Sequence, residues 1–331
     1  AFEYLLAALE SARGTPAAAP THYLNLAGTI APKKERYRPN ESRGTLAEYY
    51  RSVDVRLWAE WEAENGLDVY TLPLILNALV KGGVTAGVKQ TGTTKTYLWT
   101  FAPTMNADDL KALSLWWGDP NTQVFRSAYC MPDELTITAD ASGTDGVTLS
   151  LSGQGQFPAK VTNPTAPSML QAPFLMPSAM ELWIDTSSAI GTTEVKGRLI
   201  SAEVTIPSGI TRKWLAAGPE GNLDFQAVGR GKRHAELKLV LELPDMTQYN
   251  LWAAETALKT RIRFNGPKIE EADKVSYYNF VEVDIYGPFD ALDWGEHEGT
   301  NRTVELTILS EYDATAGYDW CVRVQNDRST L

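Results

Sequence analysis

The sequence contains two copies of one unit, and the second copy is offset from the first by about 177 residues. Gly14-Thr15 recurs as Gly191-Thr192, and Thr29-Ile30 recurs as Thr205-Ile206. Similar spacing relates further pairs: Glu3-Tyr4-Leu5 with Glu181-Leu182-Trp183, Gly44 with Gly221, Leu46 with Leu223, and Asp68 with Asp245. Because the matches keep their order and spacing, we interpret the chain as two fused copies of one fold, each with its own core.

The offset between matching residues falls late in the chain. Pro132 matches Pro288 at 156 residues, and Val147 matches Val304 at 157. We therefore expect an insertion in the first copy, at about 104–121. The predicted domains are 1–157 and 178–331, joined by a connector at 158–177, where prolines favour an extended path. Those prolines are Pro158, Pro164, Pro167, Pro173 and Pro177.

Apolar and polar residues alternate through much of both copies. The pattern is clear in Val53–Glu62 and Ala235–Leu243, and it returns in Phe280–Ile285, Thr303–Ser310, Leu135–Asp140 and Val147–Ser152. Period-two alternation is typical of antiparallel strands with one face on a core and the other in water. We predict a mainly β chain of two tandem β-sandwich or barrel domains, each with a flanking α-helix.

Three segments are candidate helices. Residues 71–81 and 248–259 follow equivalent strands in the two copies. A third candidate, 106–117, has Asn106 as a possible N-cap and acidic residues in its first turn, which favour a helix start.

Composition excludes several classes of protein. The net charge of −11 argues against a nucleic-acid-binding surface, which needs basic stripes. The two cysteines, Cys130 and Cys321, have no metal-ligand spacing, so we expect free thiols and synthesis in the cytoplasm. No basic leader or long apolar run appears, and we expect a protein that is soluble when made.

No catalytic constellation emerges from the sequence. The three histidines, His22, His234 and His297, are scattered, and no nucleophile, phosphate-loop or zinc motif is present. We expect no enzyme activity, cofactor or metal. An alternative is a carbohydrate-binding or glycoside-hydrolase-like β protein, because Glu60, Glu62 and Glu64 share one strand face beside Trp58 and Trp61 and could act on a sugar.

Two short stretches resemble a known family. Glu10-x-x-x-Gly14-Thr15 precedes the first long strand, and Glu41–Leu46 precedes the second. With the strand–helix order and the duplication, the chain resembles a bacteriophage tail tube protein of a long non-contractile tail, in its duplicated variant. Another virion component, a decoration or adhesion protein, is a further alternative.

The resemblance implies a structural protein of the virion tail, made in the host cytoplasm. Three chains would close a pseudo-hexameric ring whose inner strands form one β-barrel, and stacked rings would form a hollow tube. The implied partners are further copies of the chain, a tape-measure protein, and tail terminator and tail-tip proteins. Double-stranded DNA would pass through without specific binding, and no membrane is involved.

Two sets of residues follow as site predictions. Carboxylates on the polar strand faces are expected to line the lumen and repel DNA phosphates: Glu60, Glu62, Glu236, Glu242, Glu282, Asp284 and Glu305. Two long polar loops, 31–45 and 208–222, are expected to reach onto the next ring, because loops of this length are usually functional or disordered. Their candidate residues are Lys33, Lys34, Arg36, Arg38, Arg212, Lys213 and Trp214.

Overall fold

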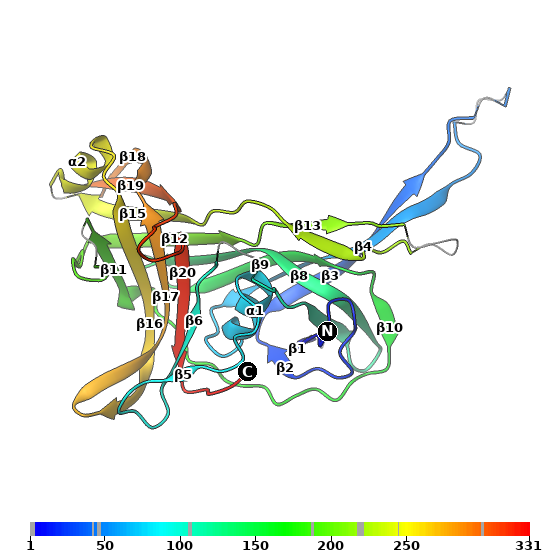
Figure 1. Cartoon of the computed structure of the whole chain (residues 1–331), viewed down its shortest axis with the longest axis horizontal. Helices are drawn as coiled ribbons and strands as arrows, with labels where there is room; N and C mark the ends of the chain where they lie inside the picture. The colour runs from blue at the N-terminus through cyan, green and yellow to red at the C-terminus, as the bar shows by residue number, and fades with distance from the viewer. Residues whose placement is uncertain are drawn as a thin grey trace.

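A computed structural model describes residues 4–41, 43–44, 48–104, 108–186, 189–216, 222–243, 245–298 and 301–331. Glu3, Ser42, Thr45, Leu46, Asn106 and Gly221, which the sequence argument used, lie outside these residues. The prediction of a mainly β chain is confirmed, with two α-helices in the described residues. Figure 1 shows strands arranged as two crossing layers, with the helix α1 (Leu72–Leu79) between them.

One layer, which we call the long sheet, is a row of eight antiparallel strands in the described part of the chain, in the order β18-β19-β15-β12-β8-β9-β4-β3. The first half of the sequence supplies β3 (Ala27–Tyr37), β4 (Val53–Gly66), β8 (Gln123–Asp140) and β9 (Thr148–Gly155). The second half supplies β12 (Leu199–Pro207), β15 (Glu236–Leu243), β18 (Phe289–Glu298) and β19 (Asn301–Leu309). All six segments with apolar–polar alternation fall in strands.

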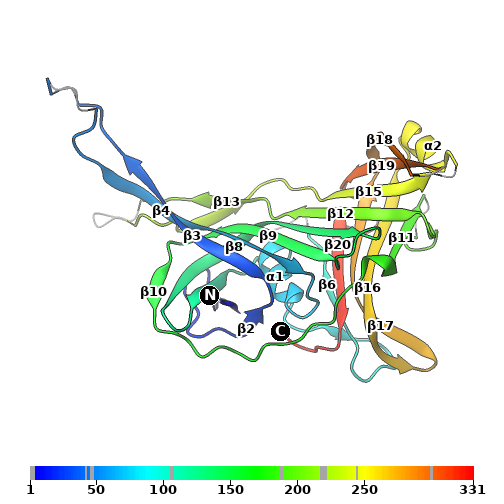
Figure 2. The ribbon, with the colours of Figure 1, turned by 180° about the vertical axis from the view of Figure 1, so that it is seen from behind.

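The second layer, the crossing sheet, runs at a steep angle to the long sheet (Figures 1 and 2). Its order is β11-β16-β17-β20-β6-β5. The strands are β11 (Met180–Asp185), β16 (Leu258–Ala272), β17 (Val275–Gly287), β20 (Trp320–Asn326), β6 (Tyr97–Phe101) and β5 (Val88–Lys89). The strands β5 and β6 come from the first half of the sequence and complete a sheet of the second half.

A smaller set of strands joins the other end of β8. Here β8 pairs with β7 and β10, and β7 continues through β1 to β2. The bounds are β1 (Tyr4–Leu9), β2 (His22–Leu24), β7 (Leu113–Asp119) and β10 (Ala159–Val161). One apolar core runs between the layers and includes Ile137, Leu239 and Val283. Burial of such side chains is the main stabilising term.

The helices follow the sequence prediction in part. The expected helix at 71–81 is confirmed as α1, whose residues are all buried. The expected helix at 248–259 is shorter: α2 spans Thr247–Ala253, and the chain resumes as β16 at Leu258. Asp68 and Asp245, matched in the sequence, both precede a helix and accept a backbone N–H, from Tyr70 at 2.7 Å and from Thr247 at 2.9 Å.

The third helix prediction, 106–117, is wrong. Residues from Leu113 onward form β7, which pairs with β1 and β8. Asp108 serves as a buried anchor, accepting hydrogen bonds from Arg230 at 2.8 Å and Arg233 at 3.0 Å. Most of β7 is buried on both faces, and such a continuous apolar run cannot be told from a buried helix by periodicity.

The Gly-Thr matches have a shared structural role. The buried Glu10 accepts hydrogen bonds from the backbone of Gly14 and Tyr129, at 2.7 Å each. The buried Asp185 accepts them from the backbone of Gly191 at 2.7 Å and of Thr193 at 2.8 Å. Both glycines have positive φ, where a side chain would be strained. Each copy therefore follows its first strand with a turn folded onto a buried carboxylate.

Most of the segment predicted as a connector has no regular structure. Within 158–177 the exceptions are β10 and the first residue of a 3₁₀ turn at Pro177–Ala179. The backbone of Val147 and Leu175 is joined by a 3.1 Å hydrogen bond, and that of Met176 and Asn265 by one of 3.3 Å. The connector thus contacts both layers as it crosses between them.

Candidate assembly and channel surfaces

The long sheet has one apolar and one polar face. Leu135, Val204 and Leu237 point into the core, whereas the residues that alternate with such positions along each strand face away from it. The cross-strand register keeps this alternation in phase across the row: Thr136 lies opposite Ser150 and Thr205, and Thr205 lies opposite Glu236. Because the side-chain period of a strand is two, the whole row presents a single continuous polar surface.

That surface, which we call the acidic face, carries carboxylates among serine and threonine hydroxyls. Register and alternation place these acidic residues on it: Glu60, Glu62, Glu64, Glu134, Asp140, Glu203, Glu236, Glu242, Asp293 and Glu305. Register and alternation also place the basic side chains of Lys33, Arg56 and Lys238 on this face. Each is paired: Lys33 with Glu60 at 3.2 Å, Arg56 with Glu35 at 3.2 Å, and Lys238 with Glu203 at 3.2 Å and Glu236 at 3.3 Å.

Two side chains of this face have shifted pKa values. The hydrogen bonds that Lys238 donates to Glu203 and Glu236 raise the pKa of Lys238. A hydrogen bond from the Trp58 indole, at 3.0 Å, lowers the pKa of Glu60. Both lysines are therefore neutralised locally, and the excess of carboxylates sets the sign of the face at neutral pH.

The structure separates the seven predicted lumen carboxylates into two groups. Five of them lie on the acidic face: Glu60, Glu62, Glu236, Glu242 and Glu305. Sequence analysis missed Glu64, Glu134, Asp140, Glu203 and Asp293, although all occupy polar positions of alternating strands. Alternation predicts which side chains of a strand lie on the same face. Only the strand order shows that strands from the two halves of the sequence share one polar face.

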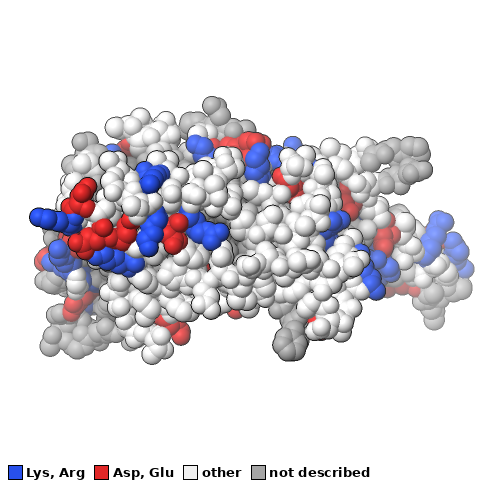
Figure 3. Space-filling view, turned by 90° about the horizontal axis from the view of Figure 1, so that it is seen from below, with Lys and Arg blue, Asp and Glu red and all other residues white. Residues whose placement is uncertain are grey.

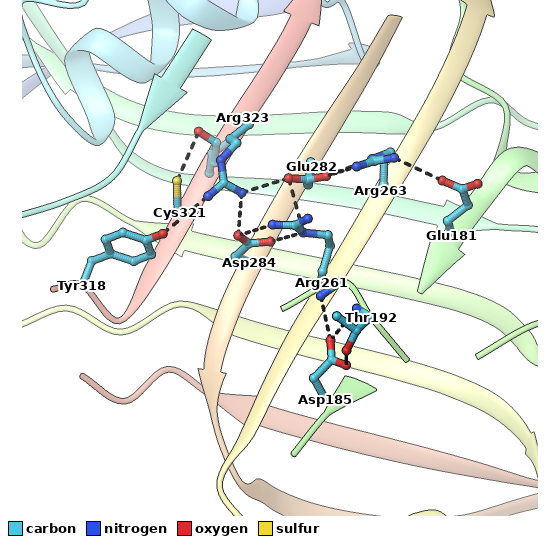
Figure 4. A network of polar contacts seen from close by, with 12 residues as sticks. Glu181, Asp185, Thr192, Arg261, Arg263, Glu282, Asp284, Tyr318, Cys321 and Arg323 are labelled. Carbon is cyan, nitrogen blue, oxygen red and sulfur yellow. Dashed lines mark hydrogen bonds and ion pairs between the residues drawn. The ribbon is translucent and has the colours of Figure 1, made fainter. Parts of the chain in front are cut away.

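Glu282 and Asp284 belong to the crossing sheet and are buried, with exposed side-chain fractions of 3% and 0%. Figure 4 shows them surrounded by the guanidinium groups of Arg261, Arg263 and Arg323, which we call the arginine cluster. The expectation that these two carboxylates lie on a solvated strand face is wrong. A buried charge is costly unless it is paired and hydrogen-bonded, and here both carboxylates have several partners.

The arginine cluster is a closely bonded network. Arg261 binds Asp284 through two nitrogens at 2.7 and 2.9 Å, and Arg323 bridges Asp284 at 2.5 Å and Glu282 at 2.9 Å. Arg263 binds Glu282 at 2.5 Å. Burial alone would lower the pKa of Arg261, but hydrogen bonds and the charge of Asp284 outweigh it and raise the pKa. The network fixes β16, β17 and β20 side by side.

The most prominent feature of the shape is a projecting hairpin. β3 and β4 are paired over their whole length, from Ala27 opposite Glu64 to Tyr37 opposite Val53. β9, the other neighbour of β4, pairs with it only from Ala59 onward. The outer part, described at 32–41, 43–44 and 48–58, is the hairpin arm, and it extends away from both sheets (Figures 1 and 2).

The hairpin arm carries many charges and exposed rings. Lys34 and Arg36 both bind Asp54, at 3.4 and 2.6 Å, and Arg56 binds Glu35 at 3.2 Å. Arg38 lies 5.6 Å from the ring centre of Tyr49. Tyr37 and Val53 are each 58% exposed, which is unusual for apolar side chains on a paired strand. The predicted loop 31–45 is therefore a strand as far as Tyr37.

The second predicted loop is arranged differently from the first. Part of 208–222 forms β13 (Ile210–Lys213), which pairs with β14 (Ala227–Arg230), and this hairpin packs on the base of the arm. Trp214 contacts Trp58, with ring centres 6.3 Å apart, and Arg56 lies 5.1 Å from the Trp214 ring. Leu57 donates its backbone N–H to Leu223 at 2.9 Å.

Within this second loop, Arg212 and Lys213 differ in their surroundings. The Arg212 side chain is 6% exposed and donates hydrogen bonds to Asp133 and to the carbonyl of Met131. Lys213 is exposed. Arg212 and Trp214 thus make contacts within their own chain.

Charge is distributed unevenly over the molecule. Figure 3 shows acidic and basic side chains intermixed at the end where the crossing sheet lies, with large uncharged areas between that end and the arm. In the described residues, no group of three or more histidine, cysteine, aspartate or glutamate side chains could hold a metal ion. No described helix is long and apolar enough to span a membrane.

Comparison with known protein families gives a match. The family model described as phage tail tube protein matches residues 3–273, which is most of the chain. No curated protein matches the sequence. The match covers the hairpin arm, the strands β1 to β15 and the first part of the crossing sheet.

Proposed function

The chain belongs to the phage tail tube protein family, and from this premise we propose that three copies close into a ring, lined by their long sheets, which stacks into the DNA conduit of the tail. Membership makes the protein a structural component of the virion tail. The observation that carries the proposal is the continuous long sheet, which has one acidic face and, within the described part of the chain, two edges without a strand partner.

The strand order supports a fused duplication. Each half contributes four neighbouring strands to the long sheet: β3-β4-β9-β8 from the first and β12-β15-β19-β18 from the second. A second set of strands corresponds as well, with β1-β7-β8-β10 matching β11-β16-β17-β20, so that the long strand β8 matches both β17 and β18. Under this correspondence the first unit extends past residue 157 to include β10, and one chain presents two adjacent units of a pseudo-hexamer.

The same correspondence moves the proposed insertion. α1 precedes β7 in the first copy as α2 precedes β16 in the second. The extra segment of the first copy is then 80–112, which contains β5 and β6, rather than about 104–121. The β16–β17 hairpin is longer than its counterpart in β7–β8, which offsets part of this insertion, so the net fall in sequence offset is smaller than the extra segment.

The junction inside the chain provides a template for the junction between chains. In the order of the long sheet, β8 is the last strand of the first unit and β12 is the first strand of the second, and the two pair antiparallel. By correspondence, β18 of one chain would pair with β3 of the next. Among the described residues, β3 and β18 are the edges of the row, and exposed edges are sites of further pairing. Closing the ring removes both edges.

The acidic face would then line the channel. Its carboxylates repel the DNA backbone, and its hydroxyls provide a neutral, hydrated surface between them. Because each cation offered to DNA increases affinity in a salt-dependent way, a wall whose two lysines are already paired favours sliding over binding. Glu282 and Asp284 are not part of this wall in the proposal.

The hairpin arm would form the contact between stacked rings. It exposes Tyr37 and Val53 and is braced at its base by Trp214. An exposed, ordered apolar surface on an extended arm is best explained by a partner that covers it. The tape-measure, terminator and tip proteins are proposed as further partners on the ground of family membership. Membership in a structural family also supports a non-enzymatic role.

Imaging of the purified protein tests the proposal. Rings or hollow rods are expected in electron micrographs, and the mass of a single ring under native conditions should equal three chains. Compact monomers that never associate would overturn the proposal, as would rings of six chains. Binding of such monomers to glycans would instead favour the carbohydrate-binding alternative.

A further inference from the structure

We propose that Trp294 of one chain inserts into an apolar pocket formed by the connector of the next chain. The proposal rests on the ring assembly proposed above, which supplies the neighbouring chain. It adds a specific contact that the family assignment does not contain.

The pocket lies beside the β3 edge of the long sheet. It has a volume of about 540 Å³. The connector supplies most of its wall, including Met169, Leu170, Pro173 and Phe174. Residues at or next to the start of β3 and the end of β4, among them Asn25 and Leu67, supply the rest. Asn25 donates hydrogen bonds to the Leu170 carbonyl at 2.9 Å and to Asp68 at 2.8 Å, which hold the connector in place.

The apolar side chains of this pocket are unusually exposed. Phe174 is 77% exposed and Met169 is 57% exposed. Prolines stiffen the connector, so these side chains are presented at little further entropic cost. An exposed apolar patch on an ordered segment marks an interaction surface.

Trp294 is the complementary feature at the opposite edge. It lies on β18 opposite Val304, on the core side of the sheet, yet it is 42% exposed. Tyr249 of α2 stacks on one side of its ring, with ring centres 6.0 Å apart and planes inclined by 22°. Arg302 lies 4.9 Å from the ring centre. The indole is thus fixed in orientation while part of its surface remains uncovered.

The register of the internal junction aligns the two features. Thr136 lies opposite Thr205. One position in each copy matches this pair. Ala291 matches Thr136 through the registers with β9 and β19, and Thr29 matches Thr205 at an offset of 176 residues. Because β18 and β3 would run antiparallel, moving three residues along each strand places Trp294 opposite Leu26 of the next chain.

Leu26 lies between the pocket-lining Asn25 and the start of β3, so Trp294 arrives at the pocket without any adjustment of the register. At the corresponding point of the internal junction, Ala139 faces Ala202, and both are buried. The tryptophan is therefore specific to the junction between chains. Buried aromatic side chains in well-fitted pockets commonly dominate the affinity of an interface.

Disulfide trapping tests the contact directly. We expect Trp294→Cys combined with Met169→Cys, and separately with Phe174→Cys, to give intermolecular disulfides in assembled particles after air oxidation. The native thiols do not interfere, because burial raises the pKa of Cys130 and of Cys321 to about 12. The matched control is Trp294→Cys with Val88→Cys, since Val88 is 71% exposed and distant in the fold, and it should give no disulfide.

A second measurement keeps the test independent of the cysteine geometry. Trp294→Ala should raise the critical concentration for assembly about tenfold or more, and Trp294→Phe should raise it less. Circular dichroism confirms that each variant is folded. If the parent forms three-chain rings but both cysteine pairs stay reduced and Trp294→Ala assembles like the parent, the pocket contact is wrong and the ring proposal stands. If the parent forms no rings, the ring proposal itself fails.

Discussion

Thr136 of β8 and Thr205 of β12 face each other across the middle of the long sheet, with their hydroxyl oxygens 3.5 Å apart. The pair lies where the two halves of the sequence meet, and the cross-strand register continues through it without a bulge. The two halves of the chain are therefore joined by ordinary antiparallel pairing, which any further unit with the same edges could repeat.

Shortening the hairpin arm should separate ring formation from stacking. Glu35 and Arg56 are paired across the arm, so an Asn-Gly turn can join them in place of residues 36–55. We expect the variant to fold and to form rings, because the long sheet and its edges are intact, but not to form tubes. Electron microscopy together with a thermal melt checks both results.

A variant with the arm intact but with Lys34 and Arg36 changed to alanine serves as the control for charge alone. Since exposed ion pairs contribute little to stability, it should fold as well as the parent. Tubes of normal length from the shortened variant would show that the arm has no role in stacking.

Reversing charge on the acidic face should make the channel retain DNA. Glu62 and Glu134 both lie opposite Ser152, so changing both to lysine places new cations close together. We expect tubes of this variant to retain short duplex DNA in sedimentation, with retention that decreases steeply as salt rises.

The glutamine double variant at the same positions removes the charges without adding cations, and it should retain little DNA. Glu255→Lys adds an exposed cation outside the long sheet and should also have little effect. Equal retention by parent and lysine tubes would argue against this face as the lumen.

The arginine cluster should contribute strongly to folding stability. Asp284→Asn leaves the partly buried guanidinium groups of Arg261 and Arg323 to share the single carboxylate of Glu282 with Arg263. Breaking a buried pair by removing one member costs about 3–5 kcal/mol, whereas an exposed pair contributes less than about 1 kcal/mol. Urea unfolding of Asp284→Asn, compared with Glu203→Gln as the exposed control, measures the difference. Similar losses in the two variants would contradict the structural role of the cluster.

Acid should release the contact between the two halves at Glu270. This side chain of β16 accepts hydrogen bonds from the backbone N–H of Lys95 at 2.8 Å and from the Thr96 hydroxyl at 2.6 Å. Burial raises the pKa of Glu270, but hydrogen bonds from Thr94, Thr96 and Lys95 outweigh it and lower the pKa to about 2.

A lowered pKa stabilises the folded form above the unfolded value, and this stabilisation is lost as pH falls from about 4.5 towards about 2. We therefore expect the Lys95 amide to lose protection from hydrogen exchange, relative to its intrinsic rate, over that range. In Glu270→Gln the protection should be lower and independent of pH. An unchanged pH dependence in that variant would assign the titration to another group.

The local pattern of apolar and polar residues predicts most of the strands. It does not predict features that depend on pairing between residues far apart in the sequence. Alternation identified β4, β15 and β19 because each has one buried and one polar face. β7 was missed because most of it is buried on both faces. Glu282 was misplaced because Arg261, Arg263 and Arg323, its partners, lie on neighbouring strands that no local pattern connects to it.

The most direct measurement is the structure of the assembled tube by electron cryomicroscopy. We expect β18 of one chain to pair antiparallel with β3 of the next, with Ala291 opposite Thr29. Three long sheets should then close one barrel that has the acidic face inside. A tube in which β3 and β18 remain unpaired, or in which the acidic face lies on the exterior, would contradict it.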